Sequence, residues 1–208
     1  MSDTIIQKHW YDGWFYAFFI DSKLNDFRDR LFRFVNPESY VLDIGCGTGG
    51  FALKLANYCA HVTGIDISEK QIRMAKKQLA RSSVNNVTFL HADASNLSGL
   101  LDRKYDSAFF SFIIHEMSHA NRLRVLKSVA QVASQLVILD YHTPHPLSFF
   151  GITTRIIEFL AGREHYTNFK DYLKHNGMDG ILNEAHLLSH LKLINRKRIF
   201  RTDLIKTG

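Results

Sequence analysis

The sequence predicts an α/β domain in which a largely parallel sheet carries helices on both faces. From about residue 39 onward, short apolar runs alternate with segments of helical periodicity, which is the pattern of parallel strands joined by crossover helices. A glycine-rich turn separates the first of these runs from the segment that follows it, as at the ligand-binding turns of open α/β sheets. The length of 208 residues suits one domain.

Five short β-rich runs are the predicted strands of this sheet. They span residues 40–44, 61–65, 87–90, 105–110 and 136–139. Helices are expected between strands at 51–57, 69–79 and 121–133. Ser68, with Gln71 three residues later, is the expected N-cap of the second helix. Residues 191–205 are β-rich with no helix between their halves and predict an antiparallel hairpin.

The composition excludes several classes of protein. With 46% hydrophobic and 22% charged residues, the chain is not of the disordered type. Its longest apolar runs are far shorter than the roughly 20 residues needed to span a bilayer, and the first residues do not have the pattern of a signal peptide. Cys46 and Cys59 form no CxxC pair, which rules out a disulfide framework and a cysteine zinc site and favours a cytoplasmic location.

The net charge of +6 is concentrated near the end of the sequence. Residues 192–206 hold six Lys or Arg and one acid, Asp203. Such a segment can attract the phosphates of lipid headgroups or nucleic acid. It can equally be an edge strand whose charges prevent aggregation, and the sequence leaves both readings open.

The glycine turn, VLDIGCGTGG at residues 41–50, fits two ligand-binding templates. Gly45, Gly47 and Gly50 satisfy the dinucleotide pattern GxGxxG, whereas Asp43 with Gly45, Gly47 and Gly49 satisfies the pattern of S-adenosylmethionine (SAM) enzymes. A carboxylate at position 43 would repel the pyrophosphate of a dinucleotide, but it suits the ammonium and sulfonium charges of SAM. Electrostatics therefore favour SAM.

Two further acids follow the next two predicted strands. Asp66 ends the second strand, about 20 residues beyond the turn, where a carboxylate holds ribose hydroxyls. Asp93 follows the third strand, where its carboxylate can accept a hydrogen bond from an adenine amino group while the Ala94 amide faces the ring. Three acids after three successive strands predict one adenosine-binding edge.

Residues 38–140 resemble the class I SAM-dependent methyltransferases, of the small type similar to the menaquinone and ubiquinone biosynthesis methyltransferases. The resemblance lies in the motifs VLDIGCGTGG, VTGIDIS, NVTFLHADASNL and YDSAFFSF. It implies a Rossmann-like, seven-stranded, mostly parallel sheet whose last strand is antiparallel, SAM as methyl donor with S-adenosylhomocysteine as product, and no metal. The single domain, 1–208, then divides into a helical, aromatic N-terminal cap (1–37), a SAM-binding core (38–140), and acceptor-side helices with a final β-hairpin (141–208).

The resemblance also implies roles for individual residues. Gly45 and Gly47, with Cys46 between them, lie under the methionine part, and Asp66 with its neighbour Ile67 holds the ribose. Asp93 and Ala94 meet the adenine, and Ser111, after the fourth strand, lines the methyl-transfer site. The sequence Asp-Tyr-His-Thr-Pro at 140–144 departs from the signature of the quinone methyltransferases, which argues against a quinone acceptor.

Residues 115–119, His-Glu-Met-Ser-His, match the HExxH pattern of zinc metalloproteases. Zinc binding needs both histidines on one helical face together with a third ligand. Here the motif directly follows a strand, and Ser118 or Asn121 is the expected cap of the next helix. We therefore expect a loop whose histidines do not converge. His115 remains a candidate general base or acceptor-orienting group beside the methyl donor, or a structural histidine bonded to the backbone.

Aromatic segments on either side of the core predict a covered acceptor pocket. Residues 10–19 contain seven aromatic rings, and residues 147–160 form an apolar run with Phe149, Phe150 and Phe159. We expect both segments to cover the catalytic face or to pack as core. Tyr11, Trp14 and Tyr16 are the expected ligand contacts in the first segment because they keep polar tips. Tyr141 and His142 are a second wall, with His142 a second candidate base, and residues 164–169 are expected to precede a helix and roof the pocket.

The predicted function is methyl transfer from SAM to an N, O or C nucleophile of a small or lipophilic acceptor. A lipid headgroup or a ring compound is favoured, with peripheral contact to a membrane surface through the basic C-terminus; a nucleic-acid substrate is not expected. Two alternatives stay open: an NAD(P)-dependent oxidoreductase and a non-catalytic SAM-fold binding protein. Oligomeric state and acceptor identity do not follow from the sequence.

Overall fold

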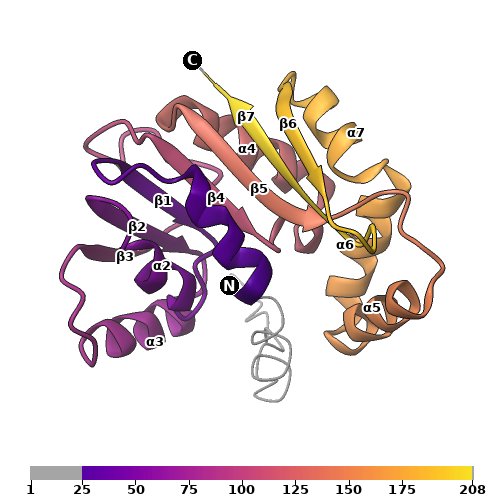
Figure 1. The fold of residues 1–208 in the computed structure, drawn as a ribbon, viewed down its shortest axis with the longest axis horizontal. Helices are drawn as coiled ribbons and strands as arrows, with labels where there is room; N and C mark the ends of the chain where they lie inside the picture. The colour runs from indigo at the N-terminus through magenta and orange to yellow at the C-terminus, as the bar shows by residue number, and fades with distance from the viewer. Residues whose placement is uncertain (1–24, 208) are drawn as a thin grey trace, which may run out of the picture.

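The computed structural model describes residues 25–207 of the chain and places a twisted seven-stranded sheet at its centre (Figure 1). The strand order is β3-β2-β1-β4-β5-β7-β6. The strands are β1 (Tyr40–Ile44), β2 (His61–Asp66), β3 (Val87–His91), β4 (Ser107–Ser111), β5 (Gln135–Tyr141), β6 (Ser189–Ile194) and β7 (Phe200–Lys206). β7 is antiparallel to both β5 and β6, and the pairs among β1 to β5 are parallel. The expected Rossmann-like sheet with its antiparallel last strand is confirmed.

Helices cover both faces of the sheet. They are η1 (Arg30–Phe34), α2 (Gly50–Leu55), α3 (Glu69–Leu79), η2 (Ile114–Glu116), α4 (His119–Val132), α5 (Phe149–Leu160), α6 (Arg163–Lys174) and α7 (Gly177–Glu184). One apolar cluster joins the sheet to α4, α6 and α7, and a second joins it to η1, α2 and α3. Within β5, Leu136 and Ile138 belong to the first cluster, whereas Val137 and Leu139 belong to the second. This alternation is the two-residue period of a strand that is covered on both sides.

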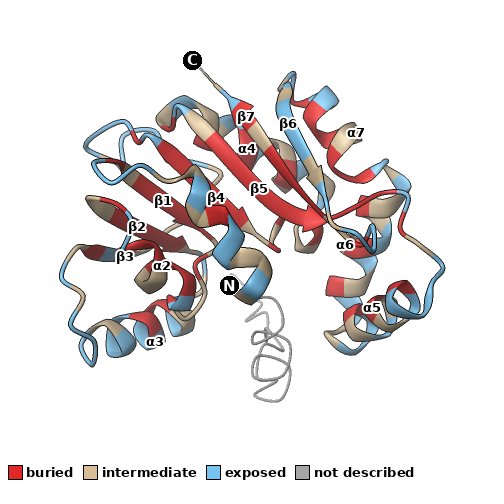
Figure 2. Cartoon of the chain, in the orientation of Figure 1, coloured by how far each residue is buried: buried red, intermediate tan, exposed pale blue. Residues whose placement is uncertain are grey.

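Burial follows the position of each strand in the sheet. The central strands are buried along almost their whole length, while β6 at the edge is largely exposed (Figure 2). In β5 every residue after Gln135 is buried. A strand that is buried on both faces is largely apolar, which is why these runs could be predicted as strands from the sequence.

Local signals also set the element boundaries. Ser68 caps α3 as expected, because its hydroxyl accepts the Gln71 amide at 3.3 Å. β4 begins two residues later than the predicted run, since Tyr105 makes only an isolated bridge to Ala133. Residues 189–206 form the expected hairpin.

Two expectations about the acceptor side are wrong. Residues 164–169 do not precede a helix, because α6 already begins at Arg163, directly after Gly162, whose φ is +124°. The aromatic residues of 147–160 neither cover the sheet edge nor fill the core: Phe149, Phe150 and Phe159 are exposed. The inward face of α5 is formed instead by Gly151, Thr154 and Glu158.

The expected N-terminal cap stays a prediction, whereas the expected basic tail is corrected in part by the structure. Tyr11, Trp14, Tyr16 and the rest of residues 1–24 lie outside the described residues. In the C-terminal hairpin, Arg201 is buried and pairs with Asp203 and Asp179, at 2.7 and 2.8 Å. Its charge is therefore structural, and the exposed basic residues of this segment stand mainly at the hairpin turn, residues 196–198. Among residues 25–207 there is no helix with the length and apolarity needed to cross a bilayer.

Candidate active site

The glycine turn between β1 and α2 is built for close approach. Gly45 has a φ of +69°, and a Cβ at this position would lie 1.7 Å from Cδ1 of Ile113. Gly47 also has a positive φ, +54°, but a Cβ there would meet no atom within 4 Å. Gly45 is therefore required by packing, whereas Gly47 faces open space. That space is where a ligand can approach the backbone.

Asp66 fastens the turn to the next helix. Its two carboxylate oxygens accept the amides of Gly47 and Ser68, at 2.9 and 2.8 Å. The carbonyl of Ile65 accepts the amides of Gly45 and Cys46. The turn is thus held rigid by the carboxyl end of β2. Each oxygen of Asp66 keeps a lone pair that can accept a ligand hydroxyl.

The carboxyl group of Asp43 lies directly behind this turn. The residue is 2% exposed, and its Oδ2 has no hydrogen-bond partner among the described residues. Burial raises the pKa of Asp43 to about 7, with Arg28 lowering it and Asp66 raising it to smaller extents. A buried, unpaired carboxylate oxygen is costly unless a cation meets it. The residues of the turn therefore fit the ammonium group of SAM.

Arg28 is a site residue that the sequence did not reveal. Its Nε donates a hydrogen bond to Ser111 Oγ at 2.7 Å, and its guanidinium lies 5.8 Å from the ring centroid of Phe112. The N-terminal segment thereby brings a cation to the carboxyl end of β4, close enough to influence Asp43. Nothing local distinguishes this arginine from others in the sequence, because its role depends on a contact across 83 positions.

Asp93, the acid that follows β3, makes a local hydrogen bond to the backbone. Asp93 is exposed, and its Oδ1 accepts the Ser95 amide at 2.8 Å, the geometry of an Asx turn. Ala94 is half-buried beside it, and Ile67 is exposed. Asp66 pairs in register with His91 of β3. The predicted adenosine-binding residues therefore lie at one edge of the sheet, and their roles stay predictions.

His115 is held at the carboxyl ends of β4 and β5 by Asp140. The residue sits in η2, and its Nδ1 lies 2.6 Å from Oδ1 of Asp140. The other oxygen of Asp140 accepts the amides of Ile114 and His115, at 2.9 and 3.2 Å. Because Asp140 accepts at Nδ1, that nitrogen carries a proton and the Nε2 side of the ring points away from the sheet.

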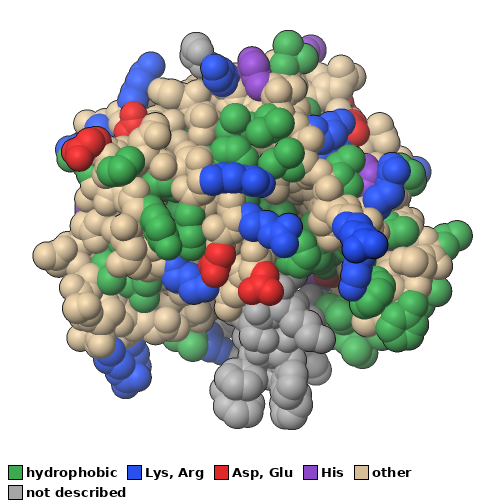
Figure 3. Space-filling view, in the orientation of Figure 1, with side chains coloured by type: hydrophobic (Ala, Val, Ile, Leu, Met, Phe, Trp, Pro, Cys, Tyr) green, Lys and Arg blue, Asp and Glu red, His purple; other side chains and the backbone are tan. Residues whose placement is uncertain are grey.

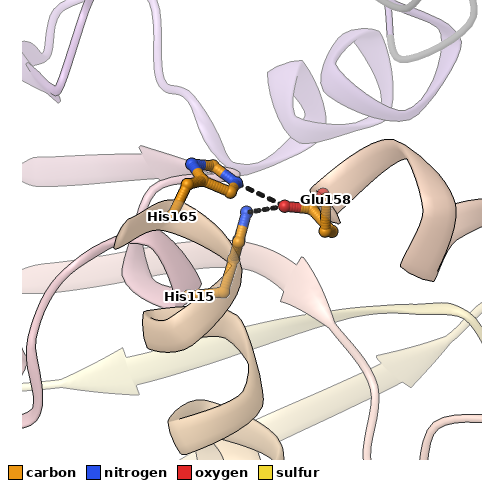
Figure 4. A group of neighbouring side chains, drawn as sticks. All are labelled: His115, Glu158 and His165. Carbon is orange, nitrogen blue, oxygen red and sulfur yellow. Dashed lines mark hydrogen bonds and ion pairs between the residues drawn. The ribbon is translucent and has the colours of Figure 1, made fainter. Parts of the chain in front are cut away.

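Glu158 of α5 faces that Nε2 atom. Figure 4 shows Glu158 between His115 and His165, with Oε2 at 3.6 Å from Nε2 of His115 and hydrogen-bonded to Nε2 of His165. Tyr141 donates its hydroxyl to Oε1 of Glu158 at 2.6 Å. We call His115, Glu158 and His165 the polar triad. All three side chains are buried.

The charges of the polar triad are coupled. Burial by itself lowers the pKa of His115, but the carboxylates of Asp140 and Glu158 outweigh it and raise the pKa to about 9. Burial likewise works to raise the pKa of Glu158, but His115, His165 and Tyr141 hold it below its usual value. At neutral pH His115 is therefore an imidazolium that faces the carboxylate of Glu158.

The HExxH histidines do not share a site, as their position after a strand predicts. His115 belongs to the polar triad, whereas His119 contacts Glu184 at 2.9 Å and lies 4.5 Å from the His175 ring centroid. Ligand atoms of the polar triad lie within 4.8 Å of one another, close enough for a metal ion. The carboxylate oxygen between the two rings, however, already accepts a proton donor from His165.

The structure separates the two residues of the predicted second wall. The ring of Tyr141 lies 4.7 Å from that of His115, beside the polar triad. His142 is buried against β7, where its amide donates to the Ile199 carbonyl at 2.7 Å. Burial, with Arg201 and Arg198 nearby, lowers the pKa of His142. The base role of His142 stays a prediction, whereas Glu158 and His165 are additional site residues. A lone acid in the apolar run 147–160 was the available signal for Glu158.

Known proteins share the fold and these motifs. Residues 41–135 match a family model described as a methyltransferase domain. The O-methyltransferase cnsE of Penicillium expansum is 34% identical over 141 residues, covering 64% of this chain and 51% of that protein. The demethylmenaquinone methyltransferase of Thermotoga maritima is 32% identical over 152 residues, covering 72% and 63%. The chain thus spans about half to two thirds of the length of these relatives.

Solved structures show the same architecture. A magnesium protoporphyrin IX methyltransferase from Synechocystis, with S-adenosylhomocysteine bound, superposes with a TM-score of 0.61 at 20% identity, covering 91% of this chain and 84% of that one. The N-methyltransferase NodS from Bradyrhizobium japonicum gives a TM-score of 0.58 at 16% identity, covering 89% of this chain and 97% of that one. The sheet topology, the glycine turn and the sequence matches define a nucleotide-binding methyltransferase fold. Residues 41–135 carry a methyltransferase domain, and the chain has the fold and the motifs of the class I SAM-dependent methyltransferases.

Proposed function

We propose that this chain transfers a methyl group from SAM to a small-molecule acceptor at the carboxyl edge of its sheet. The observation that carries the proposal is Asp43, whose buried Oδ2 lacks a partner beneath a glycine turn with open space at Gly47. A cationic amino acid satisfies that oxygen, and a phosphate does not. The matched methyltransferase domain, residues 41–135, contains the same turn.

The donor site is assembled from four strand ends. Asp43 meets the ammonium group of SAM, and Arg28, held on Ser111 at 2.7 Å, supplies positive charge for its carboxylate. Asp66 accepts the ribose hydroxyls through the lone pairs that Gly47 and Ser68 leave unused. Asp93 and the Ala94 amide receive the adenine at the end of β3. Cys46 and Ile67 flank these groups as backbone and van der Waals contacts.

The acceptor lies on the side of the polar triad. Bound SAM supplies an electrophilic methyl group on a sulfonium, and the chain positions the acceptor for in-line attack. His115 and Glu158 stand 3.6 Å apart, so a hydroxyl that reaches this pair can bond to both. The imidazolium of His115 stabilises an acceptor oxygen as it loses its proton, and the carboxylate of Glu158 receives that proton. Tyr141 and Phe169, with centroids 4.7 and 6.1 Å from the His115 ring, give the pocket an aromatic wall.

These surroundings favour an acidic hydroxyl on a ring or lipophilic molecule as the acceptor. Two of the relatives are named as an O-methyltransferase and a demethylmenaquinone methyltransferase, which agrees with such an acceptor. The aromatic wall and the oxygen-binding pair together suit a phenol or enol. A free amine would gain little from an imidazolium beside it, since like charges oppose its binding.

The buried carboxylate also weighs against the alternatives. A dinucleotide would bring its pyrophosphate over Asp43, which is ionised at alkaline pH and whose pKa is lowered by Arg28 among the described residues. A non-catalytic binding protein would not need a buried acid between two histidines at the acceptor edge, because desolvating such groups is costly. Perturbed titratable groups of this kind are characteristic of catalytic sites.

Calorimetry with S-adenosylhomocysteine, SAM and NADH tests the donor site directly. We expect the two adenosyl ligands to bind and NADH to give no heat. Asp43→Asn, which keeps the shape and removes the charge, should weaken S-adenosylhomocysteine binding at least tenfold. Methyl transfer is then measured with a panel of phenols, enols and amines. NADH binding without S-adenosylhomocysteine binding would overturn the proposal.

A further inference from the structure

Helix α5 carries its apolar side chains on the face that points away from the protein. Phe149, Phe159 and Leu160 are 79%, 63% and 70% exposed, and Ile152 and Ile156 are about half exposed. The buried residues of the same helix are Gly151, Thr154 and Glu158. A helix on a globular protein normally buries its apolar stripe and exposes its polar one. In α5 this arrangement is reversed.

The polar inner face is required by the site beneath it. Glu158 binds Tyr141 and His165. At Gly151 a Cβ would lie 1.9 Å from the carbonyl oxygen of Pro146, so no larger residue fits. These contacts fix the rotation of α5 about its axis. With that rotation fixed, the apolar residues of the helix can only face outward, and Leu147, 81% exposed, extends their surface by one more side chain.

Basic residues border this apolar surface. The turn between β6 and β7 exposes Arg196, Lys197 and Arg198, and Nζ of Lys197 lies 3.3 Å from the ring centroid of Phe150. Residues 190–202 contain no acid. In Figure 3 hydrophobic side chains gather over α5, at the lower right, with Lys and Arg side chains beside them.

We propose that the outer face of α5, together with Leu147 and the turn 196–198, docks on an anionic lipid surface. A helix that lies in a membrane interface inserts its apolar face at the boundary of headgroups and acyl chains, and neighbouring Lys and Arg pair with lipid phosphates. The 12 residues of α5 offer such a face about 18 Å long. The turn 196–198 supplies the charge.

Charge complementarity distinguishes the lipid from other occupants. A second copy docking through the same face would bring two basic turns together around a two-fold axis, and like charges oppose that contact. Residues 1–24 of the chain offer apolar side chains but only three acids against two Lys, too little negative charge to match the turn. An anionic membrane offers both an apolar interior and a dense array of phosphates.

Docking through α5 has a consequence for the proposed function. Glu158 occupies the inner face of the helix whose outer face meets the lipid, so an acceptor dissolved in the membrane would have only one helix between it and the polar triad. This consequence rests on the proposed function, whereas the docking itself does not. The two are therefore tested by separate measurements on the same samples.

Vesicle sedimentation of the full chain provides the test. We expect at least tenfold tighter binding to vesicles of phosphatidylcholine with phosphatidylglycerol than to phosphatidylcholine alone. The double variant Phe149→Ser/Phe159→Ser should lose at least tenfold in binding with an unchanged melting temperature, and Lys197→Glu/Arg198→Glu should remove the preference for the anionic vesicles. Leu188→Ser, which changes a residue 78% exposed before β6, and Lys77→Glu on α3 are matched controls that should bind as the unaltered chain does.

Four outcomes would overturn the docking proposal. The first is equal or absent binding to the two vesicles, and the second is equal loss in Leu188→Ser. The third is a dimer in light scattering that dissociates in the Phe149→Ser/Phe159→Ser variant, which would assign the face to a second copy. The fourth is a lower melting temperature with unchanged vesicle binding in that variant, which would assign it to residues 1–24. Binding of S-adenosylhomocysteine, measured alongside, should be equal in all variants. Its absence would overturn the proposed function alone.

Discussion

Asp140 and His115 form a buried pair, 2.6 Å apart, that joins the ends of β5 and β4. The carboxylate of Asp140 also accepts the backbone amides of Ile114, His115 and Tyr141. One side chain therefore sets the orientation of the imidazole and the path of the backbone around it. A hydrogen bond to the second ring nitrogen is the usual means of fixing a histidine tautomer at a functional site.

The substitution Asp140→Asn should remove the ion pair between position 140 and His115. In Asp140→Asn the imidazolium loses its strongest anionic neighbour inside the protein, and we expect the free energy of unfolding to fall by about 3 kcal/mol, the scale for breaking one partner of a buried ion pair. The pKa of His115 should fall below 9 as well. Urea denaturation and NMR titration of the imidazole measure the two effects. An unchanged pKa would contradict the role assigned to Asp140.

The same pair makes stability depend on pH. The pKa of His115 rises from 6.5 in the unfolded chain to about 9 in the folded protein. A raised folded pKa means that the contribution is complete below pH 6.5 and is lost as the pH rises through 9, amounting to ~3 kcal/mol. We expect the melting temperature to fall by roughly 6–12 °C between pH 6.5 and 9.5. The fall should be much smaller in His115→Gln and unaltered in His119→Gln.

Affinity for the methyl donor should rise with pH, whereas the stability contributed by His115 falls as the pH rises. Asp43 has a pKa of about 7 in the free protein, and an ammonium group beside it favours the ionised form, so binding expels a proton below pH 7. Affinity for S-adenosylhomocysteine should therefore weaken about tenfold from pH 8 to pH 6. Calorimetry should show no such dependence in Asp43→Asn. Asp102→Asn, at a side chain 83% exposed, is the control that should keep it.

An alanine substitution at Gly47 tests whether the ligand approaches the open side of the glycine turn. A Cβ at Gly47 meets no protein atom within 4 Å, so Gly47→Ala should fold, with a small loss from its positive φ, and should lose at least tenfold in S-adenosylhomocysteine affinity. Gly99→Ala is the matched control, because Gly99 also has a positive φ, +79°, and open surroundings. Equal affinities in the two variants would place the ligand elsewhere.

The sheet and the donor turn were predictable because their signals are local. The run at residues 40–44 is a strand with the predicted bounds, since burial on both faces favours a largely apolar sequence, here broken only by Asp43. The capping pair Ser68 and Gln71 likewise acts within one turn of helix. Asp43, Asp66 and Asp93 could be placed at one edge because parallel strands end together.

The acceptor side was less predictable because its contacts join distant segments. His115, Glu158 and His165 come from η2, α5 and α6, and no periodicity links them. The apolar run 147–160 was expected to cover the site because apolar residues are usually buried. In the protein, the rotation of α5 follows Glu158 and Gly151 instead, and the large rings face outward.

Ile113 occupies the volume that a side chain at position 45 would need, and it immediately precedes the segment that carries His115. The glycine turn of the proposed donor site and the segment that carries His115 are therefore in packing contact through Ile113. If the proposed function holds, a shift of His115 toward an incoming acceptor will change the packing of Ile113 against Gly45. Binding of one reactant should for this reason change the dissociation rate of the other. Substitutions in α5 and α6 should alter the choice of acceptor with less effect on the donor site than a substitution at position 113.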